Sequence, residues 1–258
     1  MLVSMGIIIS IVSQKGGVGK TTTSVNLAAS VAAAEKNCLL VDCDPQGNTT
    51  TSFGTDPLSL KSSLYDLIIG EQNEKEVILD TAIPMLKLIG TNPDLFGVEV
   101  EMFSKKDKEQ SINNILSSIK SQYDYIFIDC PPSLGFLTIN ALTASDYFIV
   151  PVQCEYLAME GLAQLLNTVK LIKKGLNPSL TMLGILMTMF DKRNNLSKQV
   201  TEEVRQHFKE KVFQTVIPRN VSLSEAASFG KPIILYDIRS RGAQSYLSLA
   251  KEVIQKGG

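Results

Sequence analysis

A glycine-rich loop directly follows a short apolar run near the start of the chain. The run GIIISIV ends at Val12, and residues 15–22 read KGGVGKTT. A short run rich in β-branched residues, without alternation of polar and apolar positions, is typical of a buried parallel strand. The glycines then let the backbone turn sharply and bring its N–H groups close to an anion. This order of strand, loop and helix predicts a phosphate-binding loop that holds a nucleoside triphosphate.

The residue types in the loop suit a phosphate ligand. Lys20 supplies a positive charge for β- and γ-phosphate oxygens, and Thr21 supplies a hydroxyl for Mg²⁺. The helix expected from Thr21 onward directs the positive end of its dipole at the same phosphates. The predicted nucleotide contacts in this segment are Lys15, Gly16, Gly17, Val18, Gly19, Lys20, Thr21 and Thr22.

The loop departs from the ordinary pattern G-x-x-x-x-G-K-[ST] at its first position, where Gln14 replaces glycine and a second lysine, Lys15, follows. Lys20 is sufficient to hold bound phosphates, so Lys15 is free for another task. We expect Lys15 to reach a nucleotide held by a facing copy of the protein. The alternative is a solvated lysine without a catalytic part.

Two acidic segments complete the predicted site. In YIFIDCPPS, Asp129 ends an apolar run, and we expect it to hold Mg²⁺ through a water; the alternative is a carboxylate that caps a turn. In LLVDCDPQGN, Asp42 and Asp44 are two residues apart and would share a face of an extended strand. Asp44 precedes a turn, so we assign it the orientation or activation of the attacking water.

Apolar runs alternate with helical patterns along the whole chain. This alternation predicts an α/β protein with a mainly parallel twisted sheet and helices on both faces, formed as a single domain over residues 1–258. The expected strands are 7–12, 38–42, 87–90, 125–129, 147–152, 182–188 and 211–217. The expected helices are 21–34, 107–121, 137–143, 158–174, 198–208 and 242–255. Residues 45–110 show the least regular pattern.

Cysteine spacing and the distribution of charge limit the kinds of ligand that the protein could bind. The four cysteines lack C-x-x-C spacing, which argues against zinc and iron–sulfur sites. Residues 1–150 carry 10 Lys or Arg against 17 Asp or Glu, and residues 151–258 carry 15 against 9, so the halves have net charges of −7 and +6. A basic C-terminal half suits an anionic polymer, although solvated helix faces would give the same numbers.

Five segments resemble the ParA/Soj family of partitioning ATPases, which belongs to the deviant Walker-A class together with MinD and the nitrogenase iron protein. The segments are KGGVGKTTTSVNLA, LLVDCDPQGNTT, YIFIDCPPSLG, VPVQCEYLAMEGL and TVIPRNVSLSEAASFGKPIILYD. The resemblance covers nearly the whole chain. It implies a three-layer P-loop NTPase fold, the cofactors ATP and Mg²⁺, and hydrolysis of ATP to ADP and phosphate.

The same resemblance assigns roles to individual residues. It implies a homodimer that forms face to face around two ATP molecules, with Lys15 reaching into the opposite site and Gly16 at the close approach of the loops. Asp44 matches the hydrolytic aspartate, and Asp129 matches a metal-site aspartate beside Thr21. Pro218 and Asn220 match positions that contact the adenine base.

The resemblance also implies ATP-gated binding of double-stranded DNA without sequence preference, and a ParB/Spo0J-type centromere-binding partner. The candidate DNA contacts are Lys192, Arg193, Lys198 and Arg219, followed by Arg205, Lys209 and Arg241. Relatives often have arginine where this chain has Ser222, which predicts weaker DNA binding or a shift to neighbouring residues. The expected location is the cytoplasm, on the nucleoid.

The main alternative is a MinD-like membrane-associated positioning ATPase. It would need a basic amphipathic C-terminal helix that lies on lipid. Leu247, Ala250 and Ile254 recur at helical spacing in YLSLAKEVIQKGG, and we expect this face to pack on the protein core, without stable membrane association. A catalytically inactive scaffold is disfavoured, because Lys20, Thr21, Asp44 and Asp129 are all present.

Overall fold

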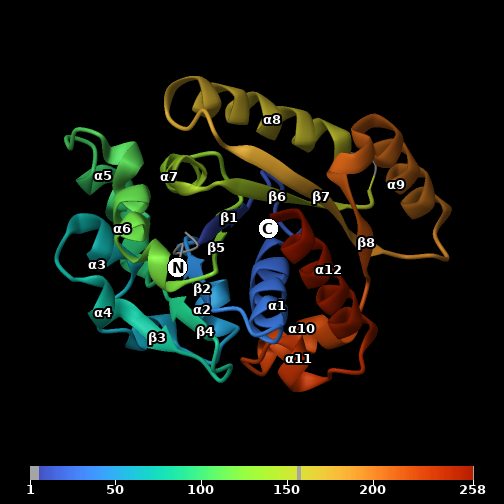
Figure 1. The fold of residues 1–258 in the computed structure, drawn as a ribbon, viewed down its shortest axis with the longest axis horizontal. Coiled ribbons are helices and arrows are strands. Elements are labelled where there is room, and N and C mark those ends of the chain that lie inside the picture. Colours follow the sequence, from blue (N-terminus) through green and yellow to red (C-terminus); the bar gives the residue numbers. More distant parts are fainter. Residues whose placement is uncertain (1–5, 156–157, 258) are drawn as a thin grey trace, which may run out of the picture.

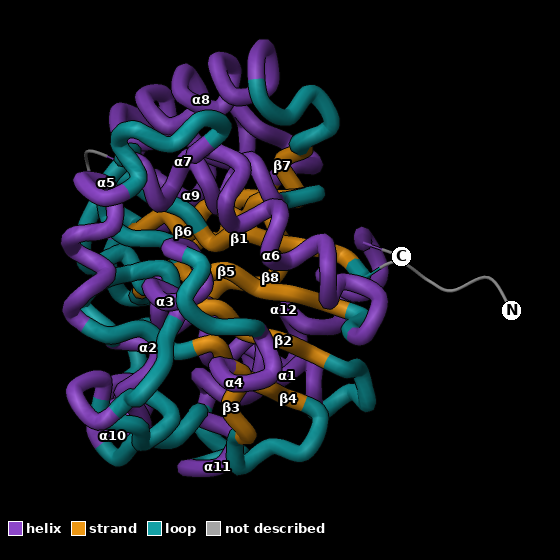
Figure 2. Tube along the Cα trace, turned by 90° about the vertical axis from the view of Figure 1, so that its left-hand side faces the viewer, coloured by secondary structure: helices purple, strands orange, loops and turns teal. Residues whose placement is uncertain are grey.

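The computed structural model describes residues 6–155 and 158–257. In this part of the chain, eight strands form one sheet in the order β3-β4-β2-β5-β1-β6-β7-β8. Figure 2 shows the strands in orange, with helices around them. Every neighbouring pair is parallel except β3 and β4. The strands are β1 (Ile7–Ile11), β2 (Cys38–Asp42), β3 (Ile78–Asp80), β4 (Leu86–Ile89), β5 (Tyr125–Asp129), β6 (Tyr147–Gln153), β7 (Thr181–Phe190) and β8 (Val212–Pro218). The predicted mainly parallel α/β fold is confirmed.

Helices cover both faces of the sheet (Figure 1). Successive strand residues alternate between two buried clusters: Ile126 packs into one and Phe127 into the other. The first cluster lies under α3 (Leu64–Ile69), α5 (Val98–Glu101), α6 (Ser111–Ile119), α7 (Phe136–Ala144), α8 (Ala158–Gly175) and α9 (Asn195–Phe208). The second lies under α1 (Lys20–Ala32), α10 (Val221–Ser228), α11 (Ile233–Tyr236) and α12 (Arg241–Gly257). Each central strand is therefore apolar on both sides, which explains the continuous apolar runs.

Residues 45–110 contain short elements, in agreement with their irregular sequence pattern. They include α2 (Asn48–Thr51) and α4 (Glu74–Val77), with 3₁₀ turns η1 (Pro57–Ser59), η2 (Pro93–Gly97) and η3 (Lys108–Gln110). Two further 3₁₀ turns are η4 (Lys120–Gln122) and η5 (Lys209–Lys211). Strand β3, a three-residue edge strand, was missed by sequence reasoning because three residues are too few to display a periodicity.

The structure corrects several boundaries. The helix predicted over 107–121 is α-helical only at Ser111–Ile119, with a 3₁₀ turn at each end. On α12 the buried stripe is Ala243, Tyr246, Leu249, Ala250 and Val253. Of the predicted stripe, Ala250 is buried, Ile254 is half-buried and packs against the second cluster, and Leu247 is half-buried. Tyr156 and Leu157 of the VPVQCEYLAMEGL segment lie outside the described residues.

The sheet order sets the position of the site. Strands β2, β5 and β1 are adjacent and parallel, so their carboxyl ends meet at one edge of the sheet. The loop after β1, Asp44 after β2 and Asp129 at the end of β5 are thereby brought together. Open α/β sheets bind ligands at this edge. None of the helices in the described ranges is long and apolar enough to cross a membrane.

Candidate nucleotide-binding site

The loop between β1 and α1 has the backbone that its glycines predict. Gly17 and Gly19 have φ angles of 73° and 88°, in the left-handed region where a side chain would be strained. Val18 between them is buried, and its carbonyl oxygen accepts a hydrogen bond of 2.8 Å from the Thr188 hydroxyl on β7. Gly19 is the N-cap of α1, so the loop leads directly into the helix N-terminus.

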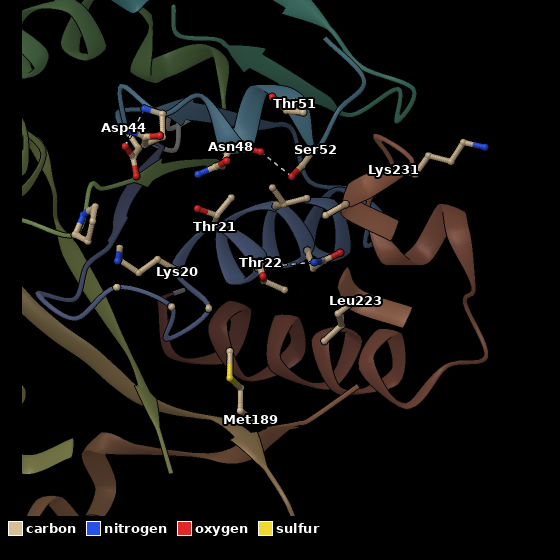
Figure 3. A pocket seen from close by; sticks show the side chains of 18 residues that line it. Lys20, Thr21, Thr22, Asp44, Asn48, Thr51, Ser52, Met189, Leu223 and Lys231 are labelled. Atoms are coloured by element: carbon tan, nitrogen blue, oxygen red, sulfur yellow. Dashed lines mark hydrogen bonds between the residues drawn. The ribbon is translucent and has the colours of Figure 1, made fainter. Parts of the chain in front are cut away.

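A cavity of about 460 Å³ opens beside this loop (Figure 3). Of the predicted site residues, seven line it: Gly16, Gly17, Gly19, Lys20, Thr21, Thr22 and Asp44. The remaining lining residues are Val25, Asn26, Gln46, Asn48, Thr51, Ser52, Pro132, Met189, Leu223, Ala227 and Lys231. In Figure 3, Lys20, Thr21 and Asp44 lie toward one end of the cavity, and Leu223 and Lys231 lie toward the other.

Lys20 is a buried cation within this cavity. Lys20 is only 7% exposed to solvent, and its ammonium donates a 3.2 Å hydrogen bond to the Lys15 carbonyl oxygen. Burial lowers the pKa of Lys20, and the negative charge of Asp129 acts in the opposite direction. No carboxylate in the described residues lies within ion-pair distance of this ammonium. An anionic phosphate is the ligand that such a cation lacks.

Asp129 is surrounded by hydroxyl groups. Thr21 and Thr49 donate to its Oδ2 at 2.8 and 2.7 Å, and Ser24 donates to its Oδ1 at 2.8 Å. Burial raises the pKa of this fully buried carboxyl, while the three hydroxyl hydrogen bonds favour its charged form. A cluster of carboxylate and hydroxyl oxygens is the donor set that Mg²⁺ prefers.

Thr49 and Ser24 were missed by sequence reasoning. Ser24 is three residues after Thr21 on α1, and Thr49 is in the short helix α2. Helical spacing could have placed Ser24 beside Thr21. The position of Thr49, 80 residues from Asp129, depends on the packing of α2 across the end of β5.

Asp42 and Asp44 have separate environments. Asp42 is fully buried, and its Oδ2 accepts hydrogen bonds from the backbone N–H of Thr50 at 2.8 Å and from the Thr50 hydroxyl at 2.6 Å. It thus caps α2 from a distance, because the N-cap residue of that helix is glycine and has no side chain. Asp44 lines the cavity, and its Oδ1 accepts from the backbone N–H of Gln46 at 3.0 Å. Of the two carboxylates, Asp44 is the one that lines the cavity.

Lys15 points along the protein surface. Its ammonium lies 3.0 Å from Glu155 Oε2, and both side chains are about half-exposed. Neither Lys15 nor Val18 is among the described residues that line the cavity. Lys15 therefore does not line the cavity of its own chain, and its approach to a second copy stays a prediction.

Another part of the cavity wall is formed by α10, the turn after it and the end of β7. Met189, Leu223, Ala227 and Lys231 lie there, and sequence reasoning missed all four. Pro218 and Asn220 are absent from the described lining; the Asn220 side chain caps α10 by accepting from the Ser222 N–H at 2.8 Å. Their contact with an adenine base stays a prediction.

A second cavity, of about 300 Å³, gathers cationic side chains at the ends of β7 and β8. Its lining includes Lys192, Arg193, Arg219 and Arg241, with Asp191 as the one acidic member. Lys198 lies outside this lining, on α9. Arg205 donates hydrogen bonds to the Phe213 and Gln214 carbonyl oxygens, so its guanidinium is occupied by the protein itself. Three of the four predicted DNA contacts are therefore neighbours.

Comparisons with known proteins agree with this geometry. The AAA_31 family, described as an AAA domain, matches residues 6–182. Over 253 residues the chain is 54% identical to the sporulation initiation inhibitor protein Soj of Bacillus subtilis, with coverage of 98% of this chain and 100% of that protein. It is 51% identical over 253 residues to the chromosome partitioning protein ParA of Myxococcus xanthus, with coverage of 98% and 89%.

A solved structure has the same fold with a nucleotide bound. It is the cobyrinic acid a,c-diamide synthase of Mycobacterium smegmatis with a bound ATP analog and magnesium. The superposition has a TM-score of 0.86 at 33% identity and covers 97% of this chain and 95% of that chain.

Proposed function

Because the chain belongs to the ParA/Soj family of chromosome-partitioning ATPases, we propose that it hydrolyses ATP as a dimer that binds DNA and is released when ATP is spent. The enzyme is an ATP hydrolase. The observation that carries the proposal is the convergence of Lys20, Asp44 and the Thr21–Asp129 pair at the glycine-rich loop. The continuous eight-stranded sheet supports a single ATPase domain over residues 1–258.

The residues of the cavity fit ATP and Mg²⁺. We assign the phosphates to the loop of Gly16, Gly17 and Gly19. The space beside Gly16 and Gly17 is open to a ligand, because a Cβ atom on either residue would meet nothing within 4 Å. Thr21 and Asp129 would hold Mg²⁺, Thr21 directly and Asp129 through a water. When bound, the metal would neutralise phosphate charge and fix the orientation of the β- and γ-phosphates.

The side chains divide the work of hydrolysis. Asp44 accepts a hydrogen bond from the attacking water and orients it toward the γ-phosphorus. Lys20 stabilises the negative charge on the β- and γ-phosphate oxygens of its own site, and Lys15 of the partner subunit does so from the other side. Phosphoryl transfer depends on positioning and charge stabilisation, so two lysines and one carboxylate are sufficient. Pairing of two copies is therefore needed for turnover.

We assign DNA binding to the cationic cavity and its surroundings: Lys192, Arg193, Arg219 and, on α9, Lys198. Phosphate contacts provide affinity without sequence preference, and a dimer doubles their number. Arg241 lines the same cavity and would add a phosphate contact, which would offset the weaker DNA binding expected from Ser222. A protein of this kind would act in the cytoplasm on the nucleoid, with a ParB/Spo0J-type partner that stimulates hydrolysis.

The MinD-like alternative finds less support. Helix α12 buries Tyr246, Leu249 and Val253 in the core, so these apolar side chains do not face outward to a lipid surface. The hydrophobic stripe of α12 therefore packs in the core of the protein.

A gel shift tests the proposal. Duplex DNA is incubated with the protein and with ATP, with ADP or with no nucleotide. We expect a shift with ATP only. A shift of equal size under all three conditions would exclude an ATP-gated DNA switch, and sedimentation of the protein with anionic liposomes in ATP would favour the membrane-associated alternative.

A further inference from the structure

Lys15, the lysine that we propose to act across the dimer, is held by a carboxylate of its own chain. Its ammonium lies 3.0 Å from Glu155 Oε2, and the two residues are 140 positions apart in the sequence. Glu155 follows β6, the neighbour of β1 in the sheet. The contact thus joins the phosphate loop to the segment after the next strand.

Glu155 is itself fixed in place by its neighbours. Its Oε1 accepts a 2.6 Å hydrogen bond from Gln153 Nε2, and its backbone N–H donates to the Gln153 carbonyl oxygen at 2.8 Å. Both carboxylate oxygens are therefore engaged, one by Gln153 and one by Lys15. A carboxylate positioned by a second side chain is a better-defined partner than a freely rotating one.

We propose that Glu155 is a positioning residue that holds Lys15 against its own chain and opposes pairing of two copies. This inference rests on the proposed function, in which Lys15 must reach a triphosphate in the partner subunit. We infer that the Lys15 ammonium leaves Glu155 when it reaches the partner's phosphates, so that each protomer breaks one ion pair when the dimer forms. Glu155 thereby sets how readily the dimer assembles.

The backbone of Lys15 has a separate contact with the nucleotide-binding site. The Lys15 carbonyl oxygen is the acceptor for the Lys20 ammonium at 3.2 Å. A triphosphate in the cavity attracts Lys20 to its own oxygens and frees that carbonyl.

The ion pair is weak enough to act as a reversible restraint. Both side chains are about half-exposed, and exposed pairs contribute roughly 0.2–1 kcal/mol, or about 1.4- to 5-fold in an equilibrium. Because two such pairs break per dimer, removal of Glu155 should lower the dimer dissociation constant by about 2- to 30-fold. Salt screens exposed pairs, so this difference should shrink as ionic strength rises.

The test compares Glu155→Gln with the unchanged protein by sedimentation equilibrium in a non-hydrolysable ATP analogue and Mg²⁺, at low and high salt. The control is Glu160→Gln, which removes the same charge from an exposed position on α8. We expect tighter pairing for Glu155→Gln at low salt, little difference at high salt, and no change for Glu160→Gln. ATP affinity of dilute, unpaired protein should be the same for all three.

Each outcome has a distinct meaning. Unchanged or weaker pairing of Glu155→Gln would overturn the restraint, and so would an effect that is independent of salt. If the unchanged protein does not pair in the analogue, the dimer of the proposed function fails. If it pairs and Lys15→Ala does not, while Glu155→Gln behaves like the control, only the role of Glu155 is wrong.

Discussion

Asp42 and Asp129 are direct neighbours in the parallel register of β2 and β5, and both carboxyls are fully buried. Their hydrogen-bond partners come from different elements: Asp42 is bonded by Thr50, and Asp129 by Thr21, Ser24 and Thr49. Burial, together with the charge of Asp129, raises the pKa of Asp42 to about 8. Two carboxyls close together in a low-dielectric interior cannot easily both be ionised.

This pair predicts a specific pH dependence of stability. The pKa of Asp42 is raised from its ordinary value of 3.8 to about 8 in the folded protein. Between these values the folded state keeps a proton that the unfolded state has lost, so the contribution of Asp42 to stability falls as pH rises. Asp42→Asn has no carboxyl to titrate at this position. The melting temperature of the variant minus that of the unchanged protein should therefore be larger at pH 8.5 than at pH 5. Thermal unfolding at both pH values measures the difference, with the exposed Asp94→Asn as control. If this difference in melting temperature became smaller as pH rises, the raised pKa of Asp42 would not destabilise the folded protein.

Asp44→Ala should separate ATP binding from hydrolysis. The cavity keeps Lys20 and the glycine loop, so ATP binding is retained, while the water loses the carboxylate that orients it. We expect phosphate release to fall by at least about 10²-fold, as for loss of a general base. The variant should accumulate as a dimer on DNA. Phosphate release and sedimentation on duplex DNA are the measurements, and rapid turnover would remove Asp44 from the proposed role.

Lys15→Ala should bind ATP and fail to pair. The Lys15 side chain is outside the cavity lining, so nucleotide affinity of the single chain should change little. Loss of the charge in trans should abolish dimer formation and hydrolysis. Fluorescent-nucleotide titration and light scattering would measure the two properties. Lys75→Ala, at an exposed position on α4, is the matched control, and full activity of Lys15→Ala would exclude a lysine acting across the dimer.

Arg193→Glu should abolish DNA retention and leave the dimer intact. Charge reversal in the cationic cavity removes one phosphate contact per protomer and adds repulsion, so the variant should not be retained on DNA at any salt concentration that retains the unchanged protein. Filter binding across a salt series tests this, with dimerisation measured in parallel. Arg239→Glu, at an exposed arginine outside the described cavity lining, controls for net charge. If Arg193→Glu and Arg239→Glu lost the same amount of DNA binding, the cationic cavity would not be the DNA-binding surface.

The order of elements could be predicted well from the sequence, and the short edge elements could not. The runs at β1, β2 and β5 carry apolar residues on both faces, and this local property already indicates a covered parallel sheet. Strand β3 pairs antiparallel with β4 and has only three residues, so its existence depends on the neighbour that it meets.

By itself the sequence determined the phosphate loop, its two lysines and the acidic residues at two strand ends. These features depend on the spacing of residues within a few positions of one another, along one strand, one turn or one turn of a helix. Only the tertiary structure decided that Asp42 caps α2 while Asp44 faces the cavity, that Thr49 bonds Asp129, and that Glu155 holds Lys15. These contacts join residues of different elements. They depend on the strand order β2-β5-β1-β6 and on helix packing across the sheet edge, which no local periodicity encodes.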